Sequence, residues 1–237
     1  MADNRIIAAL DVHTFDDMKR LVYKLGDSVS FYKVGMELFY SAGPDTVRWL
    51  KGEGKQVFLD LKIHDIPNTA AQAVRALTGL GADLMTLHGS GGSAMLKAAA
   101  EAAADEAERL SVIRPKLLAV TVLTSIDADE WQKLGHTNSI SQSVLTMADT
   151  AKAAGMDGTV SSPHEAAEIR RLSGPDFLIV TPGIRPSFAQ SNDQKRVTTP
   201  KEAIQNGATH LVIGRPITKA ADPQEAARAI MEEIREV

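Results

Sequence analysis

The segment Phe58-Leu59-Asp60-Leu61-Lys62-Ile63-His64-Asp65-Ile66-Pro67 joins the end of a strand-like run to the start of a helix. In an extended strand successive side chains point to opposite faces, so Asp60 and Lys62 share one face while the two leucines share the other. Burying an ion costs several kcal/mol unless the ion is paired. A lysine between two aspartates must therefore belong to a neutralising network or face a water-filled site, and both alternatives indicate chemistry.

The same pattern of a strand followed by a helix recurs along the chain. Strand-like apolar runs lie at residues 5–12, 30–36, 55–62, 83–88, 116–124, 157–162, 177–184 and 210–217. Helix-type stretches with a period of about 3.6 residues alternate with them, at residues 14–25, 44–51, 67–80, 93–110, 139–154, 164–172, 200–206 and 222–235.

This alternation predicts an α/β protein with a parallel sheet, and the chain length favours a single-domain (β/α)8 TIM barrel over residues 1–237. A doubly wound open sheet is the alternative. Against it, the turn after Asp11 lacks the glycine fingerprint of a dinucleotide-binding fold.

The composition is that of an ordinary globular protein. Of the 237 residues 44% are hydrophobic and 24% are charged, and the formal net charge of -4 argues against general affinity for nucleic acid. The chain has no cysteine, which excludes disulfides, thiolate nucleophiles and cysteine-ligated metals and fits a cytoplasmic location. No apolar segment approaches the roughly 20 residues that span a bilayer, so no membrane is expected as a partner.

Polar side chains are expected to gather at one rim of such a barrel, because functional groups in this fold come from the carboxyl ends of the strands. The residues that the pattern assigns to this rim are Asp11, Lys33, Asp60, Lys62, His88, Thr124 and Arg215. Two lysines and two aspartates on the first three strands would form an alternating array in which each charge stabilises its neighbours. The simpler alternative is a structural ion pair between Asp60 and Lys62 at the barrel mouth, where a barrel built only for stability could use valine and isoleucine.

Asp65 and Thr69 follow this array at the start of the next helix. Taken alone, Asp65 fits an N-cap, because Pro67 then falls in the first helical turn, where its missing N–H does no harm. Thr69 carries no distinctive pattern of its own.

The segment from Gly183 to Arg196 is long and poor in regular structure. Loops of this length in compact domains are usually lids or binding loops, and many barrels bind phosphate through the loops after strands seven and eight. Arg185 and Arg215 would pair with phosphate oxygens there, and Gly214 would let the backbone approach the ligand closely. A solvated surface loop is the alternative.

Other chemical motifs are weak. The run His88-Gly89-Ser90-Gly91-Gly92 resembles a phosphate cradle but lacks the P-loop lysine, which favours a tight turn before a helix. The histidines show no HExxH-type spacing, so no metal site is predicted. No G-x-S-x-G elbow indicates a serine hydrolase.

Taken together, these residues resemble the orotidine 5′-phosphate decarboxylase family. The resemblance covers nearly the whole chain and rests on Asp11, Lys33-Val34-Gly35, the run from Asp60 to Thr69, Thr181-Pro182-Gly183-Ile184-Arg185 and Gly214-Arg215. It implies conversion of orotidine 5′-monophosphate to UMP and CO2 in pyrimidine synthesis, without metal or organic cofactor, by a homodimer.

The same resemblance implies roles for individual residues. Lys62 would protonate C6 of the pyrimidine, and Lys33, Asp60 and Asp65 would complete the charge network around the reacting carboxylate. Asp65 and Thr69 would reach into the partner subunit's site, a role that replaces the N-cap interpretation of Asp65. The remaining substrate contacts would be Asp11 and Lys33 to the ribose, Thr124 to the pyrimidine, and Arg185, Gln194, Gly214 and Arg215 to the phosphate region.

Two other functions stay open on the sequence alone. A metal-dependent sugar-phosphate aldolase or epimerase would share the strand-end acids and the phosphate site, and activity retained in excess EDTA would separate the two enzymes. A non-catalytic nucleotide-binding barrel is the other alternative, although intact Asp60, Lys62 and Asp65 argue against it.

Overall fold

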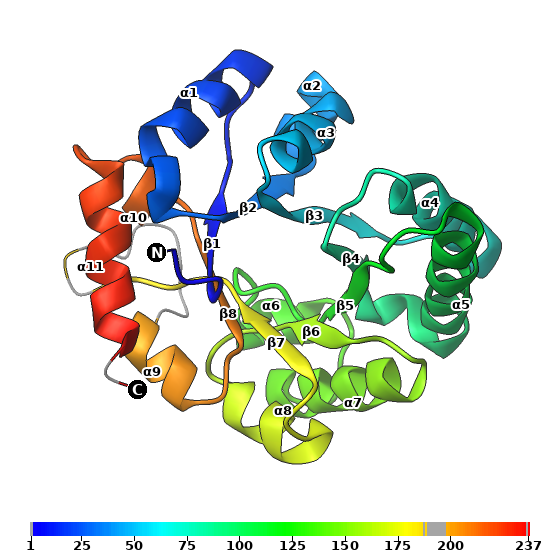
Figure 1. Cartoon of the computed structure of the whole chain (residues 1–237). Helices are drawn as coiled ribbons and strands as arrows, with labels where there is room; N and C mark the ends of the chain where they lie inside the picture. The colour runs from blue at the N-terminus through cyan, green and yellow to red at the C-terminus, as the bar shows by residue number, and fades with distance from the viewer. Residues whose placement is uncertain (1, 187, 189–197, 236) are drawn as a thin grey trace.

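Eight parallel strands close into a barrel in which each strand pairs with the next along the chain and β1 pairs with β8 (Figure 1). The computed structural model describes residues 2–186, 188, 198–235 and 237. The strands are β1 (Ile6–Ala9), β2 (Phe31–Gly35), β3 (Gln56–Ile63), β4 (Leu84–His88), β5 (Lys116–Val120), β6 (Gly158–Val160), β7 (Leu178–Thr181) and β8 (His210–Ile213). The predicted (β/α)8 barrel is confirmed, and the doubly wound alternative is wrong.

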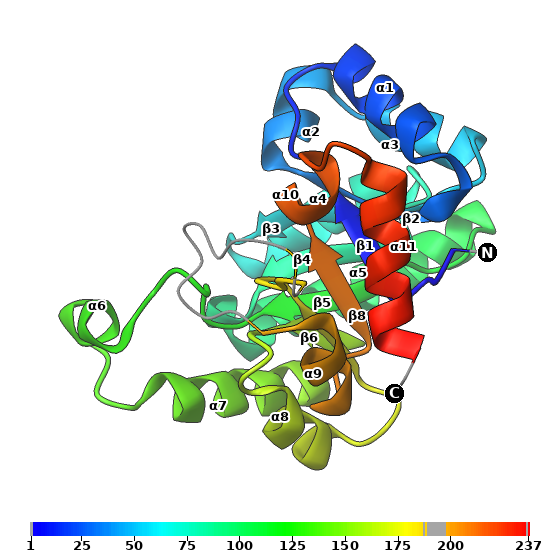
Figure 2. The same ribbon diagram turned by 90° about the vertical axis from the view of Figure 1, so that its left-hand side faces the viewer.

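Helices surround this barrel on its outside (Figure 1). The helices of the described residues are α1 (Phe15–Leu25), α2 (Met36–Ala42), α3 (Asp45–Gly52), α4 (Pro67–Thr78), α5 (Gly92–Leu110), α6 (Ala128–Lys133), α7 (Ile140–Ala153), α8 (Ala166–Ser173), α9 (Pro200–Gln205), α10 (Arg215–Thr218) and α11 (Pro223–Arg235), of which α6 lies apart from the barrel (Figure 2). Single 3₁₀ turns occur at η1 (Gly26–Ser28) and η2 (Gly89–Gly91). Within the described ranges, none of the helices has the length and apolar character needed to cross a bilayer.

The helices α2, α6 and α10 were not predicted, because one or two turns contain too few residues to reveal a helical period. Conversely, the apolar runs at 116–124 and 210–217 extend beyond their strands, which end at Val120 and Ile213. Thr124 therefore lies in the loop after β5, and Arg215 begins α10 instead of lying late in the eighth strand. The residues beyond these strands keep an apolar character where they line the rim, even though the ladder of backbone hydrogen bonds has ended.

Side chains of the strands alternate between two apolar layers. The inward layer fills the barrel and consists of Ile7, Ala9, Phe31, Phe58, Leu84, Leu118, Val180 and Val212. Their neighbours in sequence, such as Ile6, Ala8 and Tyr32, pack outward beneath the helices. Burying each large side chain stabilises the fold by about 1.5–3 kcal/mol.

The amino-terminal rim of the barrel is closed by a repeated hydrogen bond. The residue just before each of β4, β6 and β8 accepts from a backbone N–H at the start of the preceding strand. The three pairs are Asp83 from Val57 (2.8 Å), Asp157 from Leu117 (2.8 Å) and Thr209 from Ile179 (3.0 Å). Lysine or arginine neutralises both aspartates, since Lys51 lies 2.7 Å from Asp83 and Arg114 lies 2.7 Å from Asp157. This rim is thus built for stability, which is its usual role in the fold.

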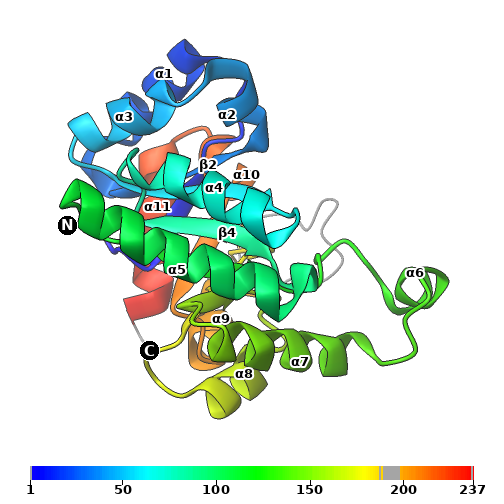
Figure 3. The same cartoon turned by 90° about the vertical axis from the view of Figure 1, so that its right-hand side faces the viewer.

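The segment between β5 and α7 projects away from the barrel and carries α6 (Figures 2 and 3). Inside this arm the Trp131 ring stacks on His136 with 3.6 Å between the ring centroids. The indole N–H of Trp131 donates to the backbone oxygen of Asn138 at 3.0 Å. Asp127 caps α6 by accepting from the backbone N–H of Glu130. These local contacts hold the arm in shape.

Candidate active site

Charged side chains from the first three strands meet at the carboxyl-terminal rim of the barrel. The ammonium of Lys33 lies 3.0 Å from the Asp11 carboxylate and 3.9 Å from that of Asp60, and the ammonium of Lys62 lies 2.8 Å from Asp60. The order Asp11, Lys33, Asp60, Lys62 therefore alternates in sign, as the sequence predicts. Each ion is stabilised by an opposite charge, which offsets the cost of removing it from water.

Asp60 is the centre of this charge array. Its side chain is only 11% exposed, and both of its oxygens are occupied: Oδ2 faces the two lysines, and Oδ1 accepts a hydrogen bond from the Thr86 hydroxyl at 3.0 Å. Thr86 lies on β4 and was not predicted as a site residue. A threonine in an apolar strand gives no signal in the sequence for such a contact.

The backbone at Lys62 departs from a regular strand. Its φ is +52°, in the left-handed region that residues other than glycine rarely adopt. The register of β3 against β4 shifts between Leu59 and Ile63. Asp60 and Lys62 do lie together, but the regular alternation of a strand, which was the reason for expecting this, is wrong. An irregular strand end brings the two side chains together.

Gly35 makes room for one member of the array. A β-carbon at this position would lie 2.7 Å from the Lys33 ammonium nitrogen, closer than side chains approach one another. The glycine that ends β2 thus leaves the space that the charged end of Lys33 occupies. The signal was present in the sequence as a glycine two positions after the strand lysine, on the same face.

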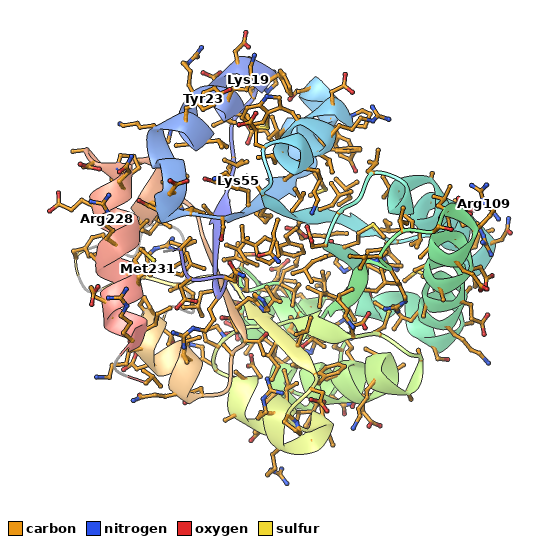
Figure 4. The ribbon with its side chains drawn as sticks, viewed as in Figure 1. Lys19, Tyr23, Lys55, Arg109, Arg228 and Met231 are labelled. Carbon is orange, nitrogen blue, oxygen red and sulfur yellow. The ribbon has the colours of Figure 1, made fainter. Side chains whose placement is uncertain are left out.

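A cavity of about 230 Å³ opens above the array. This volume is several times that of a water molecule, so the cavity can hold a small planar ring. Its lining includes the charged Lys33, Asp60 and Lys62 and the polar Thr124, Ser125 and Ser161. The rest of the lining is apolar and consists of Phe58, Val120, Val122, Leu123, Val160, Pro182 and Val212. The structure therefore brings Thr124 to the charged array, as predicted. A larger hollow of about 730 Å³ lies between η1 and α11, where Figure 4 labels Arg228 and Met231, and contains none of these residues.

Two histidine rings lie beside Lys62. The rings of His64 and His88 are 5.2 Å apart. Burial lowers the pKa of His88 below its usual value, and the charges of His64 and Lys62 lower it further, while Asp60 opposes the shift. The neutral imidazole is thus favoured at this edge of the site.

Asp65 and Thr69 follow the array along the chain, before and at the start of α4. Both are exposed, and the carboxylate of Asp65 accepts a hydrogen bond of 2.7 Å from the backbone N–H of Ile66. The N-cap of α4 is Ile66 (φ -58°, ψ 154°), without a side-chain cap, so the N-cap interpretation of Asp65 is wrong. The physical reason is Pro67, which keeps the preceding residue extended and so delays the start of the helix.

The predicted phosphate residues that the structure describes follow β7 and β8, and β8 is the strand that pairs with β1. Gly214 and Arg215 follow β8, and a β-carbon at Gly214 would contact the Asp11 carboxylate at 3.5 Å. Arg185 follows β7, with its backbone N–H donating to Thr198 and its guanidinium donating to the oxygen of Ile184. None of these three lines the cavity. Gln194 lies outside the described residues.

The comparison with known families is decisive for this chain. A family model described as "Orotidine 5'-phosphate decarboxylase / HUMPS family" matches residues 4–230. The chain belongs to this family. Orotidine 5′-phosphate decarboxylase from Trichlorobacter lovleyi is 51% identical over 98% of this chain and 96% of its own length, and the enzyme from Moorella thermoacetica is 49% identical over 98% and 93%.

Solved structures agree with this assignment to the orotidine 5′-phosphate decarboxylase / HUMPS family. The crystal structure of orotidine 5′-phosphate decarboxylase from Lactobacillus acidophilus superimposes with a TM-score of 0.87 at 42% identity, covering 98% of this chain and 99% of that one. An uncharacterized conserved protein from Geobacillus kaustophilus superimposes with a TM-score of 0.84 at 38% identity, covering 97% and 99%. Within the described residues of this family member, no group of three or more histidine, aspartate or glutamate side chains is placed to hold a metal ion.

Proposed function

We propose that this protein decarboxylates orotidine 5′-monophosphate to UMP and CO2 in pyrimidine synthesis, with Lys62 as the proton donor. The family and its closely similar members support the overall reaction. The observation that carries the mechanism is the pair of cations around the buried Asp60, with Lys62 at 2.8 Å and Lys33 at 3.9 Å, beneath a cavity of about 230 Å³.

The chemistry requires a fixed positive charge beside C6 of the pyrimidine. When the bond between C6 and the carboxylate carbon breaks, its electron pair stays on C6, in the plane of the ring, where the π-system cannot delocalise it. The Lys62 ammonium stabilises this developing charge and then transfers a proton to C6, so the products are UMP, CO2 and a neutral amine. Because the charged array exists before substrate binds, little reorganisation is needed during the reaction, and electrostatic stabilisation is then largest.

Asp60 has a second effect in this mechanism. Its carboxylate would lie near the carboxylate of the bound substrate, and the two negative charges repel. The repulsion is relieved as CO2 leaves, so it destabilises the reactant more than the transition state. Lys33 and Lys62 hold the Asp60 side chain in place for this purpose.

Substrate contacts beyond the reacting centre follow the arrangement of the rim. We assign the ribose hydroxyls to Asp11 and Lys33, the pyrimidine to Thr124, and the phosphate region to Arg185, Gln194, Gly214 and Arg215. Binding energy from the distant phosphate accelerates the reaction only where it helps to organise the charged centre.

We further propose that the enzyme is a homodimer whose subunits share their active sites. Asp65 and Thr69 lie exposed next to the array of their own chain, and Ile66 between them is 68% exposed although it is apolar. A partner subunit seated on this edge would bury Ile66 and receive Asp65 and Thr69 into its own site. We also expect a cytoplasmic location, which cell fractionation would test.

The reaction is tested by adding purified protein to orotidine 5′-monophosphate and following the loss of its absorbance. We expect turnover to UMP, with no dependence on added metal and no loss in excess EDTA. Absence of turnover would refute the proposed reaction. Turnover that EDTA abolishes would refute the cofactor-independent mechanism and show that the reaction depends on a metal.

The shared site is tested by refolding two inactive variants together. Lys62→Ala and Asp65→Ala would damage different halves of one composite site, so a mixed dimer contains one intact site and one with both lesions. We expect the mixture to regain activity. Lys33→Ala refolded with Lys62→Ala is the matched control, because both residues contact the same Asp60 and neither site of that mixed dimer is intact. If mass spectrometry confirms subunit exchange but the first mixture stays inactive, the shared site is refuted.

A further inference from the structure

The pairing between β3 and β4 is interrupted at the point where β3 carries its charges. Phe58 pairs with Leu84 and Leu59 with Met85, but the next pair is Ile63 with Leu87. Three residues of β3, from Asp60 to Lys62, therefore stand opposite a single residue of β4. That residue is Thr86.

Lys62 sits in this interruption with a strained backbone. At a φ of +52° the β-carbon of an L-residue lies too close to the following carbonyl oxygen. Such a conformation persists only where the surrounding structure holds it. The partner that holds it here is again Thr86, whose hydroxyl oxygen accepts a hydrogen bond of 2.9 Å from the backbone N–H of Lys62.

The Thr86 hydroxyl makes a second contact at the same time. Its proton is donated to Oδ1 of Asp60 at 3.0 Å, and the residue is only 1% exposed. A hydroxyl has one proton to donate, so donating it to Asp60 leaves the oxygen lone pairs to accept from Lys62. One buried hydroxyl thus fixes the carboxylate of Asp60 and the backbone from which the Lys62 side chain departs.

We infer that Thr86 is a positioning residue for the decarboxylation, an inference that rests on the function proposed above. It touches neither substrate nor the reacting atoms in this role. It acts by fixing Lys62 and Asp60 relative to each other, so that the ammonium stays 2.8 Å from Oδ2 and is directed at C6. Small errors in the placement of a reacting group reduce the rate of the chemical step by up to about 100-fold.

The test compares Thr86→Val, which keeps the shape but loses the hydroxyl, with Thr86→Ser, which keeps the hydroxyl. We expect kcat to fall about 10- to 100-fold in Thr86→Val with little change in KM, and to stay near the wild-type value in Thr86→Ser. Thr159→Val is the matched control. Thr159 is a fully buried strand threonine whose hydroxyl has no hydrogen-bond partner among the described residues, so its replacement should leave kcat unchanged.

A second measurement needs no substrate. Because the N–H of Lys62 donates to Thr86, its amide hydrogen should exchange faster in Thr86→Val than in the wild type and in Thr159→Val. An unchanged kcat in folded Thr86→Val would overturn the inference. The inference would also be overturned if the Lys62 amide exchanged as slowly in Thr86→Val as in the wild type and kcat fell equally in Thr86→Val and Thr86→Ser. The hydroxyl would then be irrelevant to both measurements.

If Thr86→Val does not fold, Thr86→Ser and Thr86→Ala decide the question, since that pair differs only by the hydroxyl. Equal kcat values in the two would overturn the inference, and a kcat at least 10-fold higher in the serine variant would support it. A wild-type protein without decarboxylase activity refutes the proposed function instead. In that case the amide exchange still shows whether Thr86 holds the backbone of Lys62.

Discussion

Replacing Gly35 with alanine is expected to impair catalysis while leaving the fold intact. A β-carbon at Gly35 would lie 2.7 Å from the ammonium nitrogen of Lys33, whereas ordinary contacts begin at 3.4 Å. That nitrogen now lies 3.0 Å from the carboxylate of Asp11 and 3.9 Å from that of Asp60. The end of a lysine can move, so the fold tolerates the methyl group, but the ammonium must leave its position between the two acids.

The size of the effect follows from these distances. Lengthening the contact between Lys33 and Asp11 to about 3.7 Å costs about 1 kcal/mol at an effective dielectric constant of about 20, which corresponds to roughly fivefold. The Asp11 side chain is 58% exposed, so water screens part of this change. Misplacement of a group that orients substrate costs up to about 100-fold. We therefore expect kcat/KM to fall by about 5- to 100-fold.

Stability should barely change. Gly35 has φ -95° and ψ -176°, which alanine also adopts. Alanine lowers the entropy of the unfolded chain, which stabilises the folded protein by about 0.4–1 kcal/mol. This gain offsets the loss of glycine as the N-cap residue of α2. The assay is the initial rate with orotidine 5′-monophosphate beside urea unfolding, and Gly52→Ala is the control because its β-carbon would meet nothing within 4 Å. Wild-type kcat/KM in a folded Gly35→Ala protein would refute the reasoning.

Three further predictions concern other parts of the molecule. Lys62→Ala should fold and bind UMP in a titration but lose nearly all turnover, because the Lys62 ammonium, 2.8 Å from Asp60, is both the stabilising cation and the acid. Near-normal turnover would show that Lys62 is not the proton donor. Arg215→Ala should lower kcat/KM about 10- to 100-fold for the nucleotide and far less for the dephosphorylated nucleoside, and equal losses would contradict a phosphate role. Burial lowers the pKa of His210 from 6.5 to about 4. Because the unfolded chain then takes up a proton before the folded protein does, the free energy of unfolding should fall as the pH drops from 6.5 towards 4, by at most about 3 kcal/mol. Urea titrations of wild type and His210→Gln test this, and identical pH profiles would contradict it.

The sequence predicts the barrel because its strands and helices alternate with clear hydrophobic periods. It also predicts that Asp11, Lys33 and Asp60 meet, since the carboxyl ends of parallel strands converge at one rim. Neither inference needs the details of side-chain packing. Both depend only on the spacing of apolar and charged residues along the chain.

Other features of the site depend on contacts between segments distant in sequence. The alternation around Lys62 looks like that of a regular strand, and the shifted register arises only in the pairing of β3 with β4. Thr86 is likewise one polar residue in an apolar run until β3 is placed beside it. Asp65 shows a different limit. Its spacing fits an N-cap, but Pro67 moves the N-cap of the helix one residue on, to Ile66, so Asp65 lies just outside the helix.

The two-residue repeat of the strands connects the core of this barrel to its chemistry. Two positions beyond an apolar residue of the inner layer, the same face carries a functional group: Ala9 is followed by Asp11, Phe31 by Lys33, Phe58 by Asp60 and Leu84 by Thr86. The packing that holds the inner layer therefore also sets the direction of the charged side chains above it. A slip of one residue in any of these strands would turn both the core residue and the charge towards the helices. The forces that fix the register of the barrel thus also fix the geometry of its charged array, and only Lys62, beyond the register shift, needs a support of its own.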